Sequence, residues 1–111
     1  MLGAWAAGAA AWAAHAGEGA AGTLSSSAQG QIIGWGMGQT AKAVAQTRAV
    51  TASLTAATVA RMAQQGVTRE WVVEQLASYN GAIQRGGTWL HNTQLYARQE
   101  LMEKILELWP K

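Results

Sequence analysis

The sequence contains no cysteine, no aspartate and no phenylalanine, and it has a single proline in 111 residues. Without cysteine the chain can form neither a disulfide nor a thiolate site. Without aspartate it lacks the usual third member of a hydrolase triad and a common magnesium ligand. Its two histidines, His15 and His91, stand far apart in the chain and make a poor set of metal ligands. We therefore expect no cofactor and no metal site.

Charged residues are scarce and unevenly placed. Lysine and arginine together number 8, the acidic residues number 6, and the formal net charge is +2. Residues 1–62 contain only one acidic residue, Glu18. No basic run is long enough to follow a phosphate backbone, so we expect no nucleic-acid partner. No basic residue precedes the apolar start of the chain, so any delivery outside the cell is expected to use a route other than a signal peptide.

Small side chains dominate the first part of the chain, residues 1–65. Glycines and serine recur at every fourth position from Ser26 to Gly38, and alanines and serine do so from Ala41 to Ala57. On a helix this spacing places small residues on one face, where another helix can approach closely, above all in lipid. The candidate membrane-contact and helix-packing residues are Ser26, Gly30, Gly34, Trp35, Gly38, Ala45, Ala49 and Ser53.

The hydrophobic pattern predicts an all-α fold of four to five helices, with Gly/Ala-rich helices in residues 1–65. The first helix is expected over Leu2–Ala16, and a second segment over Gln29–Thr40 needs packing or lipid to become helical. A third helix is expected to run without a break over Ala41–Gln65 and to end at Gly66. The uncharged stretch Gly19–Ala41 exceeds the roughly 20 residues that cross a bilayer, although its polar side chains favour a tilted or protein-lined arrangement.

Residues 66–111 have the pattern of an amphipathic helical hairpin, and they form one domain with residues 1–65. Thr68 is the expected N-cap of the first helix, and Gly86 and Gly87 are expected to end it. Asn92 or Thr93 is the expected cap of the second helix. The apolar stripes of the two helices consist of Val72, Leu76, Tyr79 and Ile83, and of Leu95, Met102, Ile105 and Trp109.

The segment from residue 66 onward also has features of a known toxin family. These features are Gly66-Val67-Thr68 at the start of a helix, Tyr79, the polar Asn92-Thr93 turn, and Arg98, Leu101 and Met102 leading into an amphipathic helix. The segment resembles the C-terminal toxin segments of bacterial polymorphic toxins, particularly of Rhs-type proteins. The Ala- and Gly-rich composition is similar to that of small Rhs-type toxins that depolarise the target cell's inner membrane.

The resemblance implies an antibacterial payload, delivered by type VI secretion into a target bacterial cell. Its partners would be membrane lipid, a parent Rhs-type shell and a cognate immunity protein. The expected action is insertion into the inner membrane and ion leakage, with no catalytic residue. Two alternatives stay open. One is an RNase-type enzyme toxin centred on His91 with Tyr96 and Arg98, and the other is a non-toxic helical packing or assembly module.

Overall fold

The structure is a computed structural model that describes residues 25–34 and 38–111. Within those residues the elements are α2 (Ser25–Gly34), α3 (Ala41–Ser53), α4 (Ala56–Gln64), α5 (Arg69–Arg85) and α6 (Trp89–Glu107). The prediction of an all-α fold is confirmed. The helix expected over Leu2–Ala16 and the candidate residue Trp35 lie outside the described residues.

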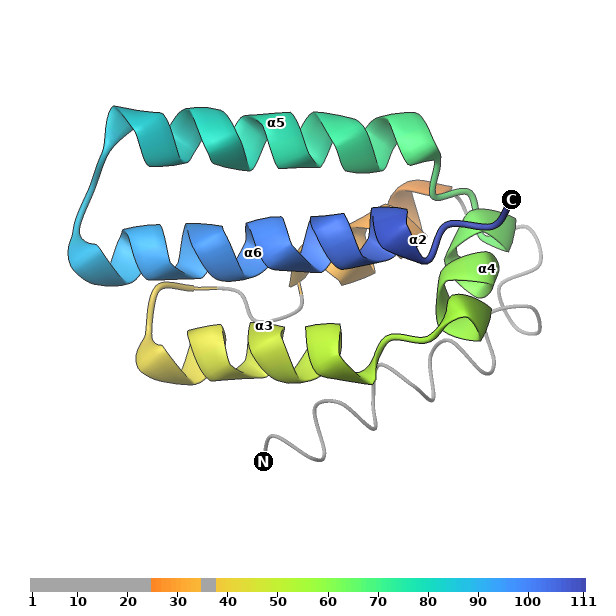
Figure 1. The fold of residues 1–111 in the computed structure, drawn as a ribbon, viewed down its shortest axis with the longest axis horizontal. Helices are drawn as coiled ribbons and strands as arrows, with labels where there is room; N and C mark the ends of the chain where they lie inside the picture. The colour runs from red at the N-terminus through yellow and green to blue at the C-terminus, as the bar shows by residue number, and fades with distance from the viewer. Residues whose placement is uncertain (1–24, 35–37) are drawn as a thin grey trace.

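Helix α6 is the central element of the bundle. It runs antiparallel to α5 and lies between α5 and α3, while α4 crosses one end of the bundle (Figure 1). Helix α5 packs on α6 along one face and leaves its other face to solvent, so Val72 is its one fully buried residue. Helix α6 buries Gln94, Ala97, Arg98, Leu101, Met102 and Ile105. Because it has neighbours on two sides, its buried surface is wider than the single stripe that the sequence indicated.

One hydrophobic core joins the two parts of the chain. Residues from the Gly/Ala-rich part, among them Val50, Val59 and Met62, pack with residues of the α5–α6 hairpin. The buried members of the core are Ala28, Ile32, Val50, Leu54, Val59, Met62, Val67, Val72, Leu101, Met102 and Ile105. The described part of residues 1–65 therefore depends on the hairpin for its burial, and the hairpin depends on it in turn.

Threonine begins each of the last four helices. The Oγ1 atoms of Thr40, Thr55, Thr68 and Thr88 accept hydrogen bonds from the backbone N–H three residues on, at 3.0 to 3.2 Å. This satisfies one of the unpaired donors at each helix start. The predicted cap at Thr68 is confirmed. The helix ends predicted at Gly66 and Gly86 are also found, with φ of 95° and 80°, where only glycine is unstrained.

The cap predicted at Asn92 or Thr93 is wrong, because Thr88 begins α6 four or five residues earlier. Thr88 directly follows the two glycines that end the previous helix, so it is the first side chain that can cap a new one. Thr93 lies inside α6, where its Oγ1 donates to the carbonyl of Trp89 at 2.8 Å. His91 and Asn92 therefore occupy the first turn of a helix rather than a polar loop.

The continuous helix predicted over Ala41–Gln65 is also wrong. The chain leaves the helix at Leu54, which has an extended backbone with ψ of 140°, and a new helix begins after Thr55. Ser53 Oγ donates to the carbonyl of Val50 at 2.9 Å, and Thr55 caps α4. Serine and threonine compete with the helical backbone for hydrogen bonds in this way. The break turns Leu54 into the core, where it is 8% exposed.

The two rows of small residues do not form continuous helical faces. Helix α2 ends at Gly34, and Gly38 lies beyond it with a non-helical φ of 111°. Gly30 and Gly34 are exposed, and a Cβ atom at either position would meet nothing within 4 Å among the described residues. In α3 the buried residues are Ala43, Val44, Thr47 and Val50 rather than the predicted row.

The uncharged stretch Gly19–Ala41 is interrupted within its described part. Helix α2 is 10 residues long, and Thr40 starts a separate helix. Among residues 25–34 and 38–111, no helix combines the length and the apolar character needed to cross a membrane.

Candidate functional site

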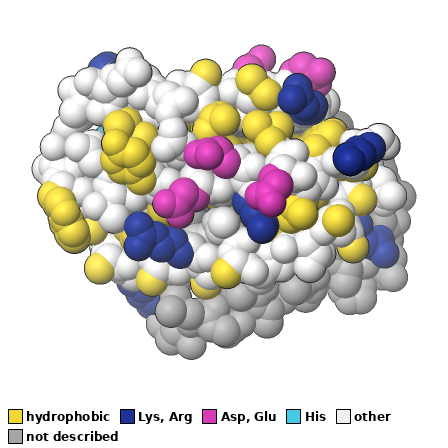
Figure 2. Space-filling view, in the orientation of Figure 1, with side chains coloured by type: hydrophobic (Ala, Val, Ile, Leu, Met, Phe, Trp, Pro, Cys, Tyr) yellow, Lys and Arg dark blue, Asp and Glu magenta, His cyan; other side chains and the backbone are white. Residues whose placement is uncertain are grey.

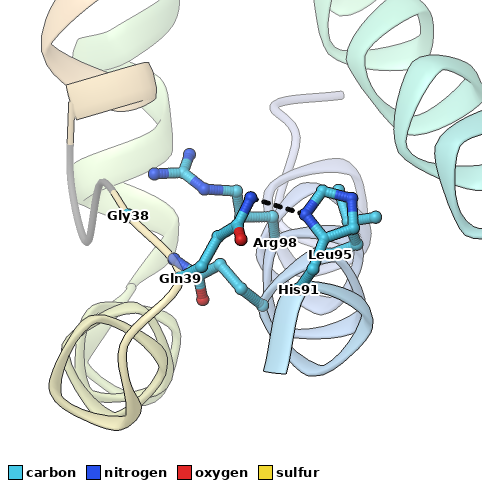
Figure 3. Close-up of a pocket in the computed structure, with 6 residues that line it drawn as sticks. Gly38, Gln39, His91, Leu95 and Arg98 are labelled. Carbon is cyan, nitrogen blue, oxygen red and sulfur yellow. Dashed lines mark hydrogen bonds between the residues drawn. The ribbon is translucent and has the colours of Figure 1, made fainter. Parts of the chain in front are cut away.

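A small pocket lies between the segment that precedes α3 and the first half of α6 (Figure 3). Its volume is about 190 Å³. It is lined by Gly38, Gln39, His91, Gln94, Leu95 and Arg98. The four residues from α6 stand at positions i, i+3, i+4 and i+7, so one helical face presents them together. The cap at Thr40 starts α3 immediately after Gln39, which fixes where the opposite wall begins.

A hydrogen bond between Gln39 and His91 joins the two segments that line the pocket. Gln39 Nε2 donates to His91 Nδ1 at 2.7 Å, across 52 positions of sequence (Figure 3). An imidazole that accepts at Nδ1 carries its proton at Nε2. Gly87 lies against the same ring, since a Cβ atom built there would come within 2.6 Å of His91 Cδ2. The ring therefore occupies space that a side chain at position 87 would take.

Among the described residues that line the pocket, Arg98 is the only one with a permanently charged side chain. It is 6% exposed, which is rare for an arginine. No acidic residue is among the described residues that line this pocket. Next to Arg98 on the helix face, Gln94 Nε2 donates to Thr47 Oγ1 at 3.1 Å and so links α6 to α3 in the buried interior. A buried guanidinium beside polar amides is suited to holding an anion.

The structure brings together two of the three residues of the enzymatic alternative. His91 and Arg98 line one pocket, but Tyr96 is 50% exposed and is not part of its lining. Sequence reasoning missed Gln39, Gln94 and Gly87. The spacing of positions 91, 94, 95 and 98 could have revealed the α6 wall, whereas nothing local to Gln39 indicated its partner.

The candidate packing residues within the described part of the chain belong to α2, to α3 and to the segment between them. Ser26, Gly30 and Gly34 lie in α2, and Gly38 lines the pocket. Ala45 and Ala49 are half-buried in α3, and exposed Ser53 ends that helix.

A second, larger hollow runs between α3 and the start of α6. It has a volume of about 400 Å³ and is lined by Ala41, Val44, Ala45, Arg48, Trp89, Leu90 and Thr93. Trp89 is 78% exposed, although large aromatic side chains usually bury most of their surface. We call this hollow the Trp89 groove.

The Trp89 groove and the pocket lie at one end of the bundle, which we call the basic end. Its segments, residues 38–48 and 75–99, contain Lys42, Arg48, Arg85 and Arg98 and no acidic residue. The acidic residues of the described chain are Glu70, Glu74, Glu100, Glu103 and Glu107. On the face drawn in Figure 2 the acidic side chains lie over the middle and the right, and none lies at the left end. The acidic residues of the described part of the chain are therefore unevenly distributed along its long axis.

Comparisons with known protein families, with curated proteins and with solved structures find no match to this chain. The pocket, the Trp89 groove and the distribution of charge are therefore the basis for a functional assignment.

Proposed function

We propose that this chain is an antibacterial toxin domain that acts on the inner membrane of a target bacterial cell and makes it leak ions. The observation that carries the proposal is the exposed Trp89 beside Arg48 at the basic end of the bundle. Indole rings favour the interface between a membrane and water. Each basic residue near an anionic membrane adds about 1 kcal/mol of attraction.

The Trp89 groove offers apolar surface next to these charges. Val44, Ala45 and Leu90 line it, and no acidic side chain is among its described lining residues to repel an anionic membrane. An aromatic ring, an apolar hollow and flanking cations together are typical of surfaces that lie in the headgroup region. The first step of the proposed action is therefore docking of the basic end on anionic lipid.

Leakage requires a second step, because the described helices of the Gly/Ala-rich part are packed into the shared core. If α3 and α4 move into lipid, they must separate from α6 and expose Leu101, Met102 and Ile105. Lipid can cover such apolar surface, and Gly30 and Gly34 leave α2 open to close approach by another helix. The proposed active form is thus an opened domain whose helices associate in the membrane.

The proposal includes the setting that the resemblance implies. The domain would be delivered from a parent Rhs-type shell by type VI secretion, and a cognate immunity protein would neutralise it in the producing cell. A partner that held α3 against α6 would block the opening step.

The test is dye release from vesicles by the full chain. Vesicles of phosphatidylcholine and phosphatidylglycerol in equal parts are compared with phosphatidylcholine alone. We expect release from the anionic vesicles, a clear loss for Trp89→Ala, and no loss for Tyr96→Ala, which removes another exposed aromatic side chain of the same helix. Absence of release from both vesicles, or equal release by Trp89→Ala and the wild type, would overturn the proposal.

The enzymatic alternative has its own readout. Its specific support is the placement of His91 and Arg98 on one pocket. The purified chain is tested for degradation of RNA. If it degrades RNA, and His91→Ala abolishes this activity in a variant that remains folded, the RNase hypothesis replaces the membrane proposal. An acid–base residue typically contributes about 10²- to 10⁴-fold to such a rate.

A further inference from the structure

We infer that the pocket between Gln39 and α6 is a binding site for a phosphate group. Two sources share this chemistry, the headgroup of an anionic phospholipid and free phosphate. In its lipid form the inference rests on the proposed membrane action and specifies what the basic end recognises there.

Arg98 supplies the charge of the site. Its guanidinium has five N–H donors, so it can bond within the protein and still present donors to a ligand. At 6% exposure its charge is screened less by water than a surface charge would be. Guanidinium groups bind phosphate oxygens through paired hydrogen bonds, which supplies direction as well as attraction.

Gln39 supplies a neutral donor from the wall of the pocket that precedes α3. One N–H of its amide bonds to His91 Nδ1, and the same Nε2 atom carries a second N–H. His91 acts here as a positioning residue, because its ring fixes the orientation of the Gln39 amide. Gly87 leaves room for the ring in this position, since a Cβ atom there would displace it. The site is thus built from two segments that are distant in sequence, residues 38–39 and residues 87–98.

The size of the pocket limits what can enter it. A volume of about 190 Å³ accommodates a tetrahedral oxyanion, whereas sites for drug-sized molecules usually start at about 300 Å³. The ligand is therefore a phosphate group rather than a whole nucleotide. Residues 38–48 and 75–99 contain no acidic residue, so these two segments add no repulsion against an anion.

The position of the pocket connects it to the Trp89 groove. Trp89 and Leu90 line the groove and the next residue, His91, lines the pocket. A phospholipid whose headgroup phosphate enters the pocket would therefore lie beside a groove that can take part of its apolar chain. This adjacency makes the lipid the first source to test.

The first experiment titrates the full chain with inorganic phosphate and follows side-chain N–H signals by NMR. We expect saturable shifts of the Gln39 amide and the Arg98 Nε–H, with a Kd on the order of 1 mM. Gln39→Ala is expected to weaken binding about tenfold, the worth of one hydrogen bond to a charged group. Gly87→Ala should weaken it as well, because it moves the His91 ring without removing any donor.

The variants are chosen so that folding does not decide the result. Gln39 and Gly87 are exposed, whereas a substitution of buried Arg98 risks the core. Tyr96→Ala is the matched control and should bind phosphate like the wild type. Absence of saturable shifts, or wild-type affinity in both pocket variants with unchanged circular dichroism, would overturn the inference.

The second experiment separates the two sources. If Gln39→Ala and Gly87→Ala lose binding to vesicles containing phosphatidylglycerol, the ligand is a lipid headgroup. If they lose only inorganic phosphate and sediment with those vesicles like the wild type, the ligand is free phosphate. Dye release without phosphate binding refutes the pocket alone, and phosphate binding without dye release refutes the membrane proposal alone.

Discussion

The hairpin α5–α6 and the shorter helices α2–α4 contribute to one core from very different sequences. The hairpin helices have 17 and 19 residues and contain every acidic residue of the described chain. Helices α2, α3 and α4 have 10, 13 and 9 residues, no acidic residue and mostly small side chains. Short helices of this kind are marginal on their own, so α3 depends on packing against α6, and α2 and α4 depend on the shared core.

The two parts of the domain have different structural roles. The hairpin supplies long helices and most of the charge, and α6 offers two packing surfaces. The α2–α4 part supplies one side of the core and half of each hollow at the basic end. The two parts are expected to unfold together, since their core residues are in mutual contact.

The largest expected effect comes from removing one core methionine in each part. Met62 in α4 and Met102 in α6 are both 0% exposed. Replacing either by alanine should lower the free energy of unfolding by about 2–5 kcal/mol. Chemical denaturation followed by circular dichroism should show one transition that shifts in both variants. A Met62→Ala protein with a separate, unshifted transition for the hairpin would break the picture of a shared core.

The next effect concerns the buried hydrogen bond between the two parts. Thr47→Val removes the Oγ1 atom that accepts from Gln94 and should destabilise the fold by about 1–3 kcal/mol. Thr51→Val is the control, because Thr51 Oγ1 bonds only to the carbonyl of Thr47 within the same helix. Thermal melts compare the two. Equal melting temperatures for both variants would mean that the link between α3 and α6 contributes nothing measurable.

A smaller loss of stability, similar in the two parts of the chain, is expected when the caps at the helix starts are removed. Thr55→Ala in the Gly/Ala-rich part and Thr68→Ala in the hairpin should each cost about 1 kcal/mol, since each removes one capping oxygen. Thr→Ser at the same positions should recover most of that loss. If Thr55→Ala is neutral, the break between α3 and α4 is set by the burial of Leu54 rather than by the cap.

The smallest effect has the opposite sign. Gly30→Ala should stabilise the fold by about 0.5–1 kcal/mol, because the position is helical and a Cβ atom there meets nothing within 4 Å. Gly86→Ala, at a φ of 80°, should instead destabilise it. Dye release is measured on the same variants, because it shows whether the small-residue face is needed for leakage. A Gly30→Ala protein that is more stable but has lost leakage would assign that glycine to helix contact in the membrane.

The sequence predicted those features that depend on neighbouring residues. Gly66, Thr68 and Gly86 set their helix ends through local backbone chemistry, and all three were predicted in the right role. The break at Leu54 was missed because a helical pattern continues on both sides of it. It depends on the burial of that leucine as well as on the adjacent serine and threonine.

Only some of the residues that line the candidate pocket could be predicted from the sequence. His91 and Arg98 drew attention because their side chains can do chemistry, but Tyr96 did too and lies elsewhere. The pairing of Gln39 with His91 spans 52 positions, and it arises only when α3 packs against α6. The burial of Arg98 was unpredictable for the same reason, since an arginine in an amphipathic helix is normally assigned to the solvent side.

The long separation between Thr47 and Gln94 has a consequence for the order in which the domain assembles. Their hydrogen bond joins residues 47 positions apart and so closes a long loop, whereas only three residues connect α5 to α6. Loop-closure entropy favours the local pair, so we expect the hairpin to form first and α3 to dock last. The last helix to dock is also the first to detach. Amide hydrogen exchange should therefore be faster at Val50 than at Leu101, and equal protection at both would contradict this order. Fluctuations of the folded chain would then begin at the helix that must leave α6 when the domain opens.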